Sequence, residues 1–286
     1  MSLTSSQTGH TFSRRVAPFA PVMLALLMNG VPQGTSPQPA TPDVGFAQSC
    51  ASPHFPSDAP TVMDTTSCPI LGNGGAETWQ NEAKNNFCAP DPATPITIQD
   101  LIDLQADVQK DPTIPFGNTR SHPLTSTAGP AKDRAALVKL GEGSQVVLNG
   151  YVLIARQEGA ESVNCGTHVP NSAVYHDIHI SIVQNPDDTE CSGVVAEMVP
   201  HHRPVAWTPA NLLAVAKAKL PVRVTGQRMF DSSHSPCSNG VSVQGDPSRA
   251  SLWEVHPIYK FEVCPQGDCS SGAGWVSLED WTKTRQ

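Results

Sequence analysis

The sequence predicts a mainly β protein whose core is a small, closed Greek-key barrel of five strands. Pro and Gly together make up 48 of the 286 residues, a composition that is rich in turns. Between residues 141 and 264, apolar and polar residues alternate in several segments, as half-buried strands require. A helix signal falls between the third and fourth of these segments. This order of elements predicts an OB-fold-like barrel with one helix between strands 3 and 4.

The five strands are predicted from alternation and from the turn residues that separate them. They cover residues 145–156, 175–183, 194–199, 221–230 and 252–263, and the first is broken or bulged at Gly150. The helix starts at Thr208-Pro209, because Thr is a good N-cap and Pro suits the first helical position. One core is expected to contain Val146, Leu148, Ile178, Ile180, Ile182, Val222 and Val224. An immunoglobulin-like sandwich is the rival fold, but its strands are connected mainly by turns.

The chain outside the barrel divides by composition. Residues 1–40 read as an export signal and low-complexity leader, and residues 41–140 as a loop-rich extension with a helix near 97–110. A second, shorter helix is predicted over residues 131–140, ended by Gly141. The barrel follows as residues 141–264, and residues 265–286 form a C-terminal tail.

The N-terminus and the cysteines both indicate an exported protein, either periplasmic or extracellular. Arg14-Arg15 precede an apolar run over residues 16–28, which is the layout of a signal peptide. This run is shorter than the roughly 20 residues that span a bilayer, so no membrane span is expected in the mature chain. Eight cysteines follow the run, and an even number in an exported chain predicts disulfide bonds. Only the pair Cys264 and Cys269 is suggested by its spacing, across a Pro-Gln-Gly-Asp turn.

Charge excludes one class of partner. The formal net charge is −8, and residues 141–264 contain eight basic against twelve acidic residues. Nonspecific nucleic-acid binding is therefore not expected. The chain also lacks a Gly-x-Ser-x-Gly elbow, a phosphate-binding loop and a dinucleotide fingerprint.

Polar residues on the predicted strands form the candidate site. The candidates for ligand binding are Asp177, His179, Glu197, Asp231, His234, Glu254 and His256. Residues two apart on a strand share a face, so Asp177 with His179 and Glu254 with His256 project from the outer face of the barrel. Imidazole and carboxylate are ordinary ligands of zinc or manganese, which predicts a divalent-metal site at His179, Glu254 and His256. Carboxylate–histidine pairs also satisfy one another structurally, and this remains the alternative.

The same residues carry a family resemblance. The pattern Asp177-x-His179, Glu197, Asp231-x-x-His234 and Trp253-Glu254-x-His256-Pro257 resembles a family of uncharacterised exported bacterial proteins with an OB-like core. The resemblance covers residues 140–264 and implies a fold and a residue pattern, without an activity. A Ser/Gly-rich insertion over residues 235–250 separates the last two motifs, which leaves their convergence open.

Two further groups of residues are weaker candidates. The segment His201-His202-Arg203-Pro204 offers metal ligands or an anion-binding arginine, although a polar turn explains it more simply. Tyr151, Trp207 and Trp253 are able to stack on bases or sugars, but aromatic residues are few and most are needed for packing.

Two functions of different classes fit these observations. The favoured one is a secreted or periplasmic binding protein for a small molecule, glycan or peptide, with the polar set as specificity groups or a structural metal site. The other is a metal-dependent hydrolase, for example a phosphodiesterase, in which the bound metal acidifies water and a remaining carboxylate acts as base.

Overall fold

The computed structural model describes residues 50–56, 78–114, 116, 134–159, 173–243, 245 and 247–285. Contacts divide the chain into Met1–Ala40 and Thr41–Gln286, and every described residue belongs to the second unit. The predicted export signal and leader (residues 1–40), residues 131–133, Cys68 and Cys165 all lie outside the described residues.

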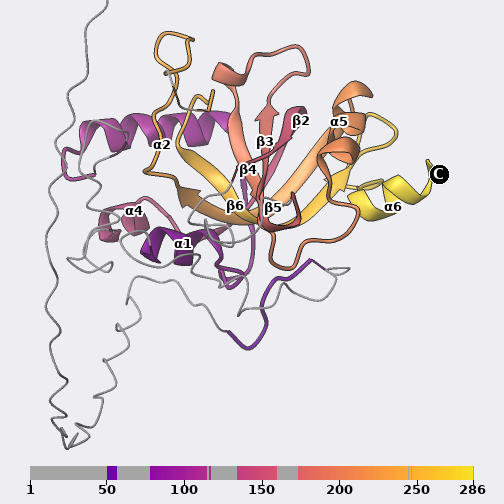
Figure 1. Ribbon diagram of the computed structural model, residues 1–286, viewed down its shortest axis with the longest axis horizontal. Helices are drawn as coiled ribbons and strands as arrows, with labels where there is room; N and C mark the ends of the chain where they lie inside the picture. Colours follow the sequence, from indigo (N-terminus) through magenta and orange to yellow (C-terminus); the bar gives the residue numbers. More distant parts are fainter. Residues whose placement is uncertain are drawn as a thin grey trace, which may run out of the picture. The chain divides into compact units, whose positions relative to one another are not determined.

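The core of the structure is a closed five-stranded barrel (Figure 1). Its strands are β2 (Gln145–Gln157), β3 (Ile178–Val183), β4 (Val194–Met198), β5 (Pro221–Phe230) and β6 (Trp253–Val263). They are hydrogen-bonded in the order β2-β3-β4-β6-β5, and pairing of β5 with β2 closes the circle. Strands β4 and β6 are parallel, whereas the other neighbours are antiparallel. Helix α5 (Pro209–Lys217) lies between β4 and β5 in the chain, so the predicted OB-fold-like topology is confirmed and the sandwich is excluded.

The interior of the barrel contains the predicted residues. All seven, from Val146 and Leu148 through the three isoleucines of β3 to Val222 and Val224, belong to one buried cluster. Helix α5 begins as predicted, because the Thr208 hydroxyl accepts a hydrogen bond from Asn211 N and Pro209 occupies the first turn. The apolar residues Leu212 and Val215 of this helix are buried in the same core.

Two details of the predicted strands are wrong. Strand β3 begins at Ile178 and not at residue 175, because Ala173–Tyr175 form a short 3₁₀ turn. The irregularity of β2 lies between Val152 and Ile154 and not at Gly150, which is regularly paired with Val222. Gly150 is required for another reason, since a Cβ there would lie 2.6 Å from Ile182 Cγ2 and 2.8 Å from Val183 O.

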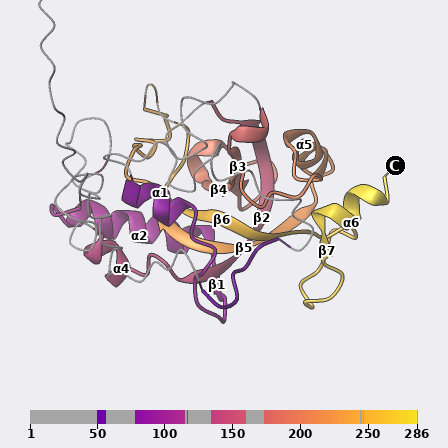
Figure 2. The same ribbon diagram turned by 60° about the horizontal axis from the view of Figure 1, so that its bottom comes forward.

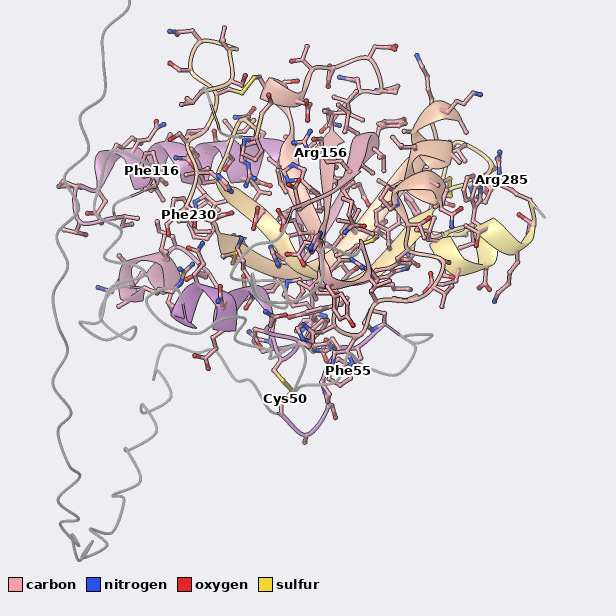
Figure 3. The ribbon with its side chains drawn as sticks, in the orientation of Figure 1. Cys50, Phe55, Phe116, Arg156, Phe230 and Arg285 are labelled. Carbon is pink, nitrogen blue, oxygen red and sulfur yellow. A yellow bond between two sulfur atoms is a disulfide. The ribbon has the colours of Figure 1, made fainter. Side chains whose placement is uncertain are left out.

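Helices cover both ends of the barrel, as Figures 1 and 2 show from two directions. At one end lie α1 (Thr78–Lys84), α2 (Ile98–Lys110) and α4 (Ala135–Lys139), and at the other lie α5 and α6 (Leu278–Lys283). Helix α2 matches its prediction: Thr97 and Asp100 form a reciprocal capping box, and Ile98, Leu101 and Val108 are buried in the core. In Figure 3, Phe116 lies beside Phe230, with ring centroids 6.3 Å apart.

The sequence analysis does not predict four short helices and strands. They are α1, α6, strand β1 (Thr94–Ile96), which runs parallel to β2, and strand β7 (Val276–Ser277), which pairs with β6. A strand of two or three residues is too short to show an alternation. Helix α1 gives no apolar stripe, because its buried positions include Gln80 and Lys84.

Three disulfides link the described cysteines: Cys50–Cys88, Cys191–Cys237 and Cys264–Cys269. The last is the pair that the turn sequence predicts. Such bonds are typical of proteins that fold in an oxidising compartment. None of the helices within the described part of the chain is both long and apolar enough to cross a membrane.

Gly226 provides a test of barrel closure. A Cβ at this position would lie 2.4 Å from Pro257 O and 2.6 Å from Val255 Cγ1, so the backbone of β6 would have to move. We expect Gly226→Ala to lower the free energy of unfolding by about 2 kcal/mol or more, as overpacking of a core does. Gly159→Ala is the matched control, because nothing lies within 4 Å of its added Cβ. Urea unfolding followed by tryptophan fluorescence measures both, and equal midpoints would contradict the packing argument.

Candidate functional site

The site is built on the outer face of three neighbouring strands, β3, β4 and β6. Alternation turns His179 away from the buried isoleucines, and the register places it opposite Glu197 on β4. Val255 of β6 pairs with Ala196 of β4, so Glu254 and His256 lie on either side of this pair. Three adjacent strands therefore carry acidic and imidazole side chains toward the same region.

This outer face is buried, which the sequence does not predict. The relative exposure is 1% for Asp177 and His179, 4% for Glu197, and 0% for Glu254 and His256. The segment that begins with α1 covers part of the barrel's polar surface. From this segment, Gln80 donates a hydrogen bond to Asp231 and Asn86 donates one to Gln227. In the other direction, the Tyr259 hydroxyl of the barrel donates to Asn86 O. Charged groups on this face are consequently held in a medium of low dielectric constant, where each must be compensated.

Glu197 lies between the two histidines. Its Oε1 is 3.4 Å from His179 Nδ1, and its Oε2 is 3.3 Å from His256 Nδ1. Burial alone would raise the pKa of Glu197, but the neighbouring His256 and His179 hold this pKa far below its ordinary value. The Glu197 side chain is therefore a carboxylate at neutral pH.

Asp177, Glu197 and His256 form a possible metal-binding trio. Each offers one ligand atom, and the three atoms lie within 4.8 Å of one another. Donor atoms around a bound zinc ion are about 3 to 4 Å apart, so a small inward movement would complete such a shell. The predicted ligand set of His179, Glu254 and His256 shares only His256 with this trio and stays a prediction.

Glu254 does not belong to the trio because its two oxygens contact other partners. Its Oε1 is 3.0 Å from His256 Nδ1, and its Oε2 accepts a hydrogen bond of 2.9 Å from Arg249 Nη1. Burial alone would lower the pKa of His256, but Glu197 and Glu254 raise it. A carboxylate at Nδ1 orients the ring and directs the opposite nitrogen toward a ligand, as outer residues do around many metal sites.

The other ring nitrogens are unsatisfied. Nε2 of His179 and Nε2 of His256 are both buried and have no hydrogen-bond partner among the described residues. A buried polar atom without a partner is costly, and such atoms are rare unless an ion or water occupies the position. Imidazole nitrogen and carboxylate oxygen, which this buried group combines, are the donor types that a divalent transition metal takes.

The remaining candidates continue this network on the other side of Glu254. Asp231 Oδ2 lies 3.2 Å from Lys84 Nζ, 3.6 Å from His234 Nε2 and 4.0 Å from Arg249 Nη1. Burial opposes ionisation of Asp231, but these three groups hold its pKa well below the ordinary value. Six of the seven predicted residues thus belong to one continuous set of polar contacts, and Asp177 lies within 4.8 Å of two of them in the trio.

The insertion over residues 235–250 does not separate the last two motifs. Its Arg249 bridges Asp231 and Glu254, and Cys237 ties the insertion to Cys191 near β4. Arg249, Lys84 and Gln80 are the members of the network that the sequence analysis missed. Arg249 gives no signal within a Ser/Gly-rich segment, and the other two lie on an unpredicted helix.

The network contains more buried acidic side chains than permanent cations. Asp177, Glu197, Asp231 and Glu254 are four buried acids, whereas Lys84 and Arg249 are the buried permanent cations beside them. Arg203 adds a further positive charge that faces Asp177. Among these seven side chains one negative charge remains, and either a protonated His256 or a bound cation would neutralise it.

The weaker candidates have structural roles. Arg203 Nη1 donates to His176 O at 2.7 Å and to Met198 O at 3.2 Å, which organises the turn after β4. The rings of His202 and Phe55 stack with their centroids 3.5 Å apart. Burial, and to a smaller extent the charge of the nearby His201, lowers the pKa of His202 to about 4. Trp207 and Trp253 are buried in the core and present no surface for stacking.

Asp231→Asn tests whether the network is held by charge. At pH 7 the variant removes the carboxylate that lies 3.2 Å from the buried Lys84 Nζ, and we expect it to lose about 3 to 5 kcal/mol of unfolding free energy. Because the pKa of Asp231 is lowered in the folded state, its contribution is complete above the unfolded pKa near 4 and disappears as the pH falls through the folded value. The deficit of the variant should therefore shrink in acid.

Asp187→Asn is the control for this experiment, because the Asp187–Lys219 pair lies on the surface and surface pairs contribute little. Denaturation at pH 7 and at pH 3 measures both variants. A loss at Asp231 no larger than that at Asp187 would contradict the argument.

Comparisons with protein-family models, with curated proteins and with solved structures found no match for this chain. The resemblance to uncharacterised exported bacterial proteins stays a prediction.

Proposed function

We propose that this chain is an exported binding protein whose OB-like barrel carries a buried divalent-metal site. Asp177, Glu197 and His256 are the ligands, and His179 is the fourth donor. The observation that carries the proposal is the convergence of three ligand atoms within 4.8 Å. The buried, partnerless Nε2 atoms of His179 and His256 support it.

Zinc or manganese is the proposed ion. Imidazole with carboxylate suits both metals, whereas copper(I) and iron–sulfur clusters prefer thiolates. The described cysteines are engaged in disulfides and offer no thiolate. A divalent cation would also offset the acidic excess of the network and leave His256 neutral, as metal ligation requires.

The compartment is proposed from the disulfides and the N-terminus together. Three disulfides among the described residues indicate an oxidising environment. The basic pair and apolar run near the start of the chain have the layout of an export signal. A periplasmic or secreted protein satisfies both observations.

Binding is preferred to hydrolysis because of the burial of the site. A hydrolytic metal keeps a coordination position open to water and substrate. All three trio residues are buried, and their neighbours are engaged in structural ion pairs. This arrangement best supports a structural role, in which a metal ion with no coordination position open to solvent links three strands.

Metal content is the direct test. Protein purified from an oxidising compartment should bind one zinc or manganese ion per chain and should unfold at a higher temperature when the ion is present. His256→Gln and Glu197→Gln should each weaken binding by more than about tenfold, because each removes a ligand. His54→Gln is the control, since His54 contacts Ala89 O outside the trio. Elemental analysis and calorimetric titration measure these values, and a wild-type protein that binds neither ion would overturn the proposal.

The variant Glu254→Gln tests whether Glu254 orients His256 or binds the metal itself. Because Glu254 contacts His256 Nδ1 and Arg249, its loss should weaken metal binding by about 10- to 100-fold while the stoichiometry stays at one. His234→Gln should leave the affinity unchanged, since His234 contacts Asp231 at the far side of the network. If Glu254→Gln abolished the site, Glu254 would be a ligand, as the sequence analysis first predicted.

A further inference from the structure

A second site lies on β2 and β5, strands that contribute none of the metal-binding trio. It is a cleft of about 360 Å³ between the barrel wall and the loop that follows β6. Six of its lining residues have side chains suited to recognition: Asn149, Tyr151, Gln184, Arg223, Asp268 and Trp275. The volume falls within the range of sites for small ligands.

The register of the barrel explains why these side chains face outward together. On β2 and β5, Asn149 pairs with Arg223 and Tyr151 pairs with Pro221. Their sequence neighbours Leu148 and Val222 are fully buried in the barrel core. Since successive residues of a strand face opposite sides, the recognition residues project to the outside of the barrel.

The other wall of the cleft is held in place by several contacts. The Cys264–Cys269 disulfide closes the loop that carries Asp268. Val276 pairs with Val263 of β6, which anchors the neighbouring Trp275. The Arg223 guanidinium lies 4.8 Å from the centre of the Trp275 ring. A binding site that is already ordered loses less conformational entropy when a ligand binds.

The charges in the cleft favour a neutral ligand. Arg223 is already paired with Glu262 through two hydrogen bonds of 2.7 and 2.9 Å, and Lys260 Nζ lies 2.7 Å from the same carboxylate. These two cations share one carboxylate, and the charge of Asp268 at the cleft brings the sum of the four groups to zero. Hydrogen bonds from Ser270 lower the pKa of Asp268, so this residue is a carboxylate that would repel an anion.

We propose that this cleft binds a neutral saccharide. Tyr151 and Trp275 supply aromatic surface for the C–H face of a sugar ring, because aromatic side chains combine large apolar area with a polar tip. Asn149, Gln184 and Asp268 supply donors and acceptors for its hydroxyl groups. Trp207 and Trp253 cannot take this role, since both are buried in the core. The site is independent of the proposed metal.

Saturation-transfer NMR and calorimetry with three neutral trisaccharides, maltotriose, cellotriose and N,N′,N″-triacetylchitotriose, test this proposal. At least one should bind with a dissociation constant of about 10 mM or tighter. Trp275→Ala and Asn149→Ala should each weaken that binding at least about fivefold, and Trp275→Phe should restore part of it. Phe55→Ala is the matched control, because Phe55 is an exposed aromatic residue that does not line the cleft.

The outcomes separate this site from the metal site. Saccharide binding should persist after chelation and in His256→Gln, even if no metal is ever found. Failure of all three sugars to bind at about 10 mM, or unchanged binding in both Trp275→Ala and Asn149→Ala with the fold intact by circular dichroism, would overturn the proposal. Asn149 is exposed on a strand, so its variant tests recognition even if Trp275→Ala loosens the loop.

Discussion

Neutralisation of four buried acids is the constraint on which the rest of the structure depends. Asp177, Glu197, Asp231 and Glu254 lie on the outside of a barrel too small to enclose them, yet little of their surface reaches solvent. Lys84 comes from α1 and Arg249 from the insertion before β6, so distant parts of the chain supply the compensating charges. The cover over the barrel is thus specified by electrostatics as much as by apolar packing.

This constraint explains the unusual character of α1. A helix that covers a hydrophobic core normally presents an apolar stripe, but the buried positions of α1 include Gln80 and Lys84. Gln80 donates to Asp231 and accepts from Ser232, while Lys84 forms an ion pair with Asp231. Among the described side chains of α1, Ala83 is the apolar one that is buried, in a small cluster with Met229. Polar complementarity and the nearby Cys50–Cys88 disulfide keep this segment in register with the barrel.

Much of the barrel could be predicted from the sequence, because a strand that buries one face has apolar residues at every second position. The isoleucines of β3 show this period directly, and Thr208-Pro209 marks the start of α5. Five of the seven candidate residues were found for the same reason, since they lie on or beside the opposite face of β3, β4 and β6, whereas Asp231 and His234 follow the end of β5. Their burial was not predictable, because it depends on α1, whose inward residues are polar. Which side chains form the trio was not predictable either, since Arg249 draws Glu254 aside and the two histidines hold Glu197.

The polar network joins parts of the chain that are far apart in sequence. Lys84 and Asp231 are 147 residues apart, and Tyr259 and Asn86 are 173 residues apart. Contacts of this kind form late in folding, because a long loop must close before they stabilise anything. No partial chain that lacks β6 contains His256, so an incompletely synthesised or translocated polypeptide has no complete site. If the chain is exported unfolded and binds the proposed metal, the ion has to come from the compartment in which the last strand joins the barrel, and the supply there decides which ion is bound.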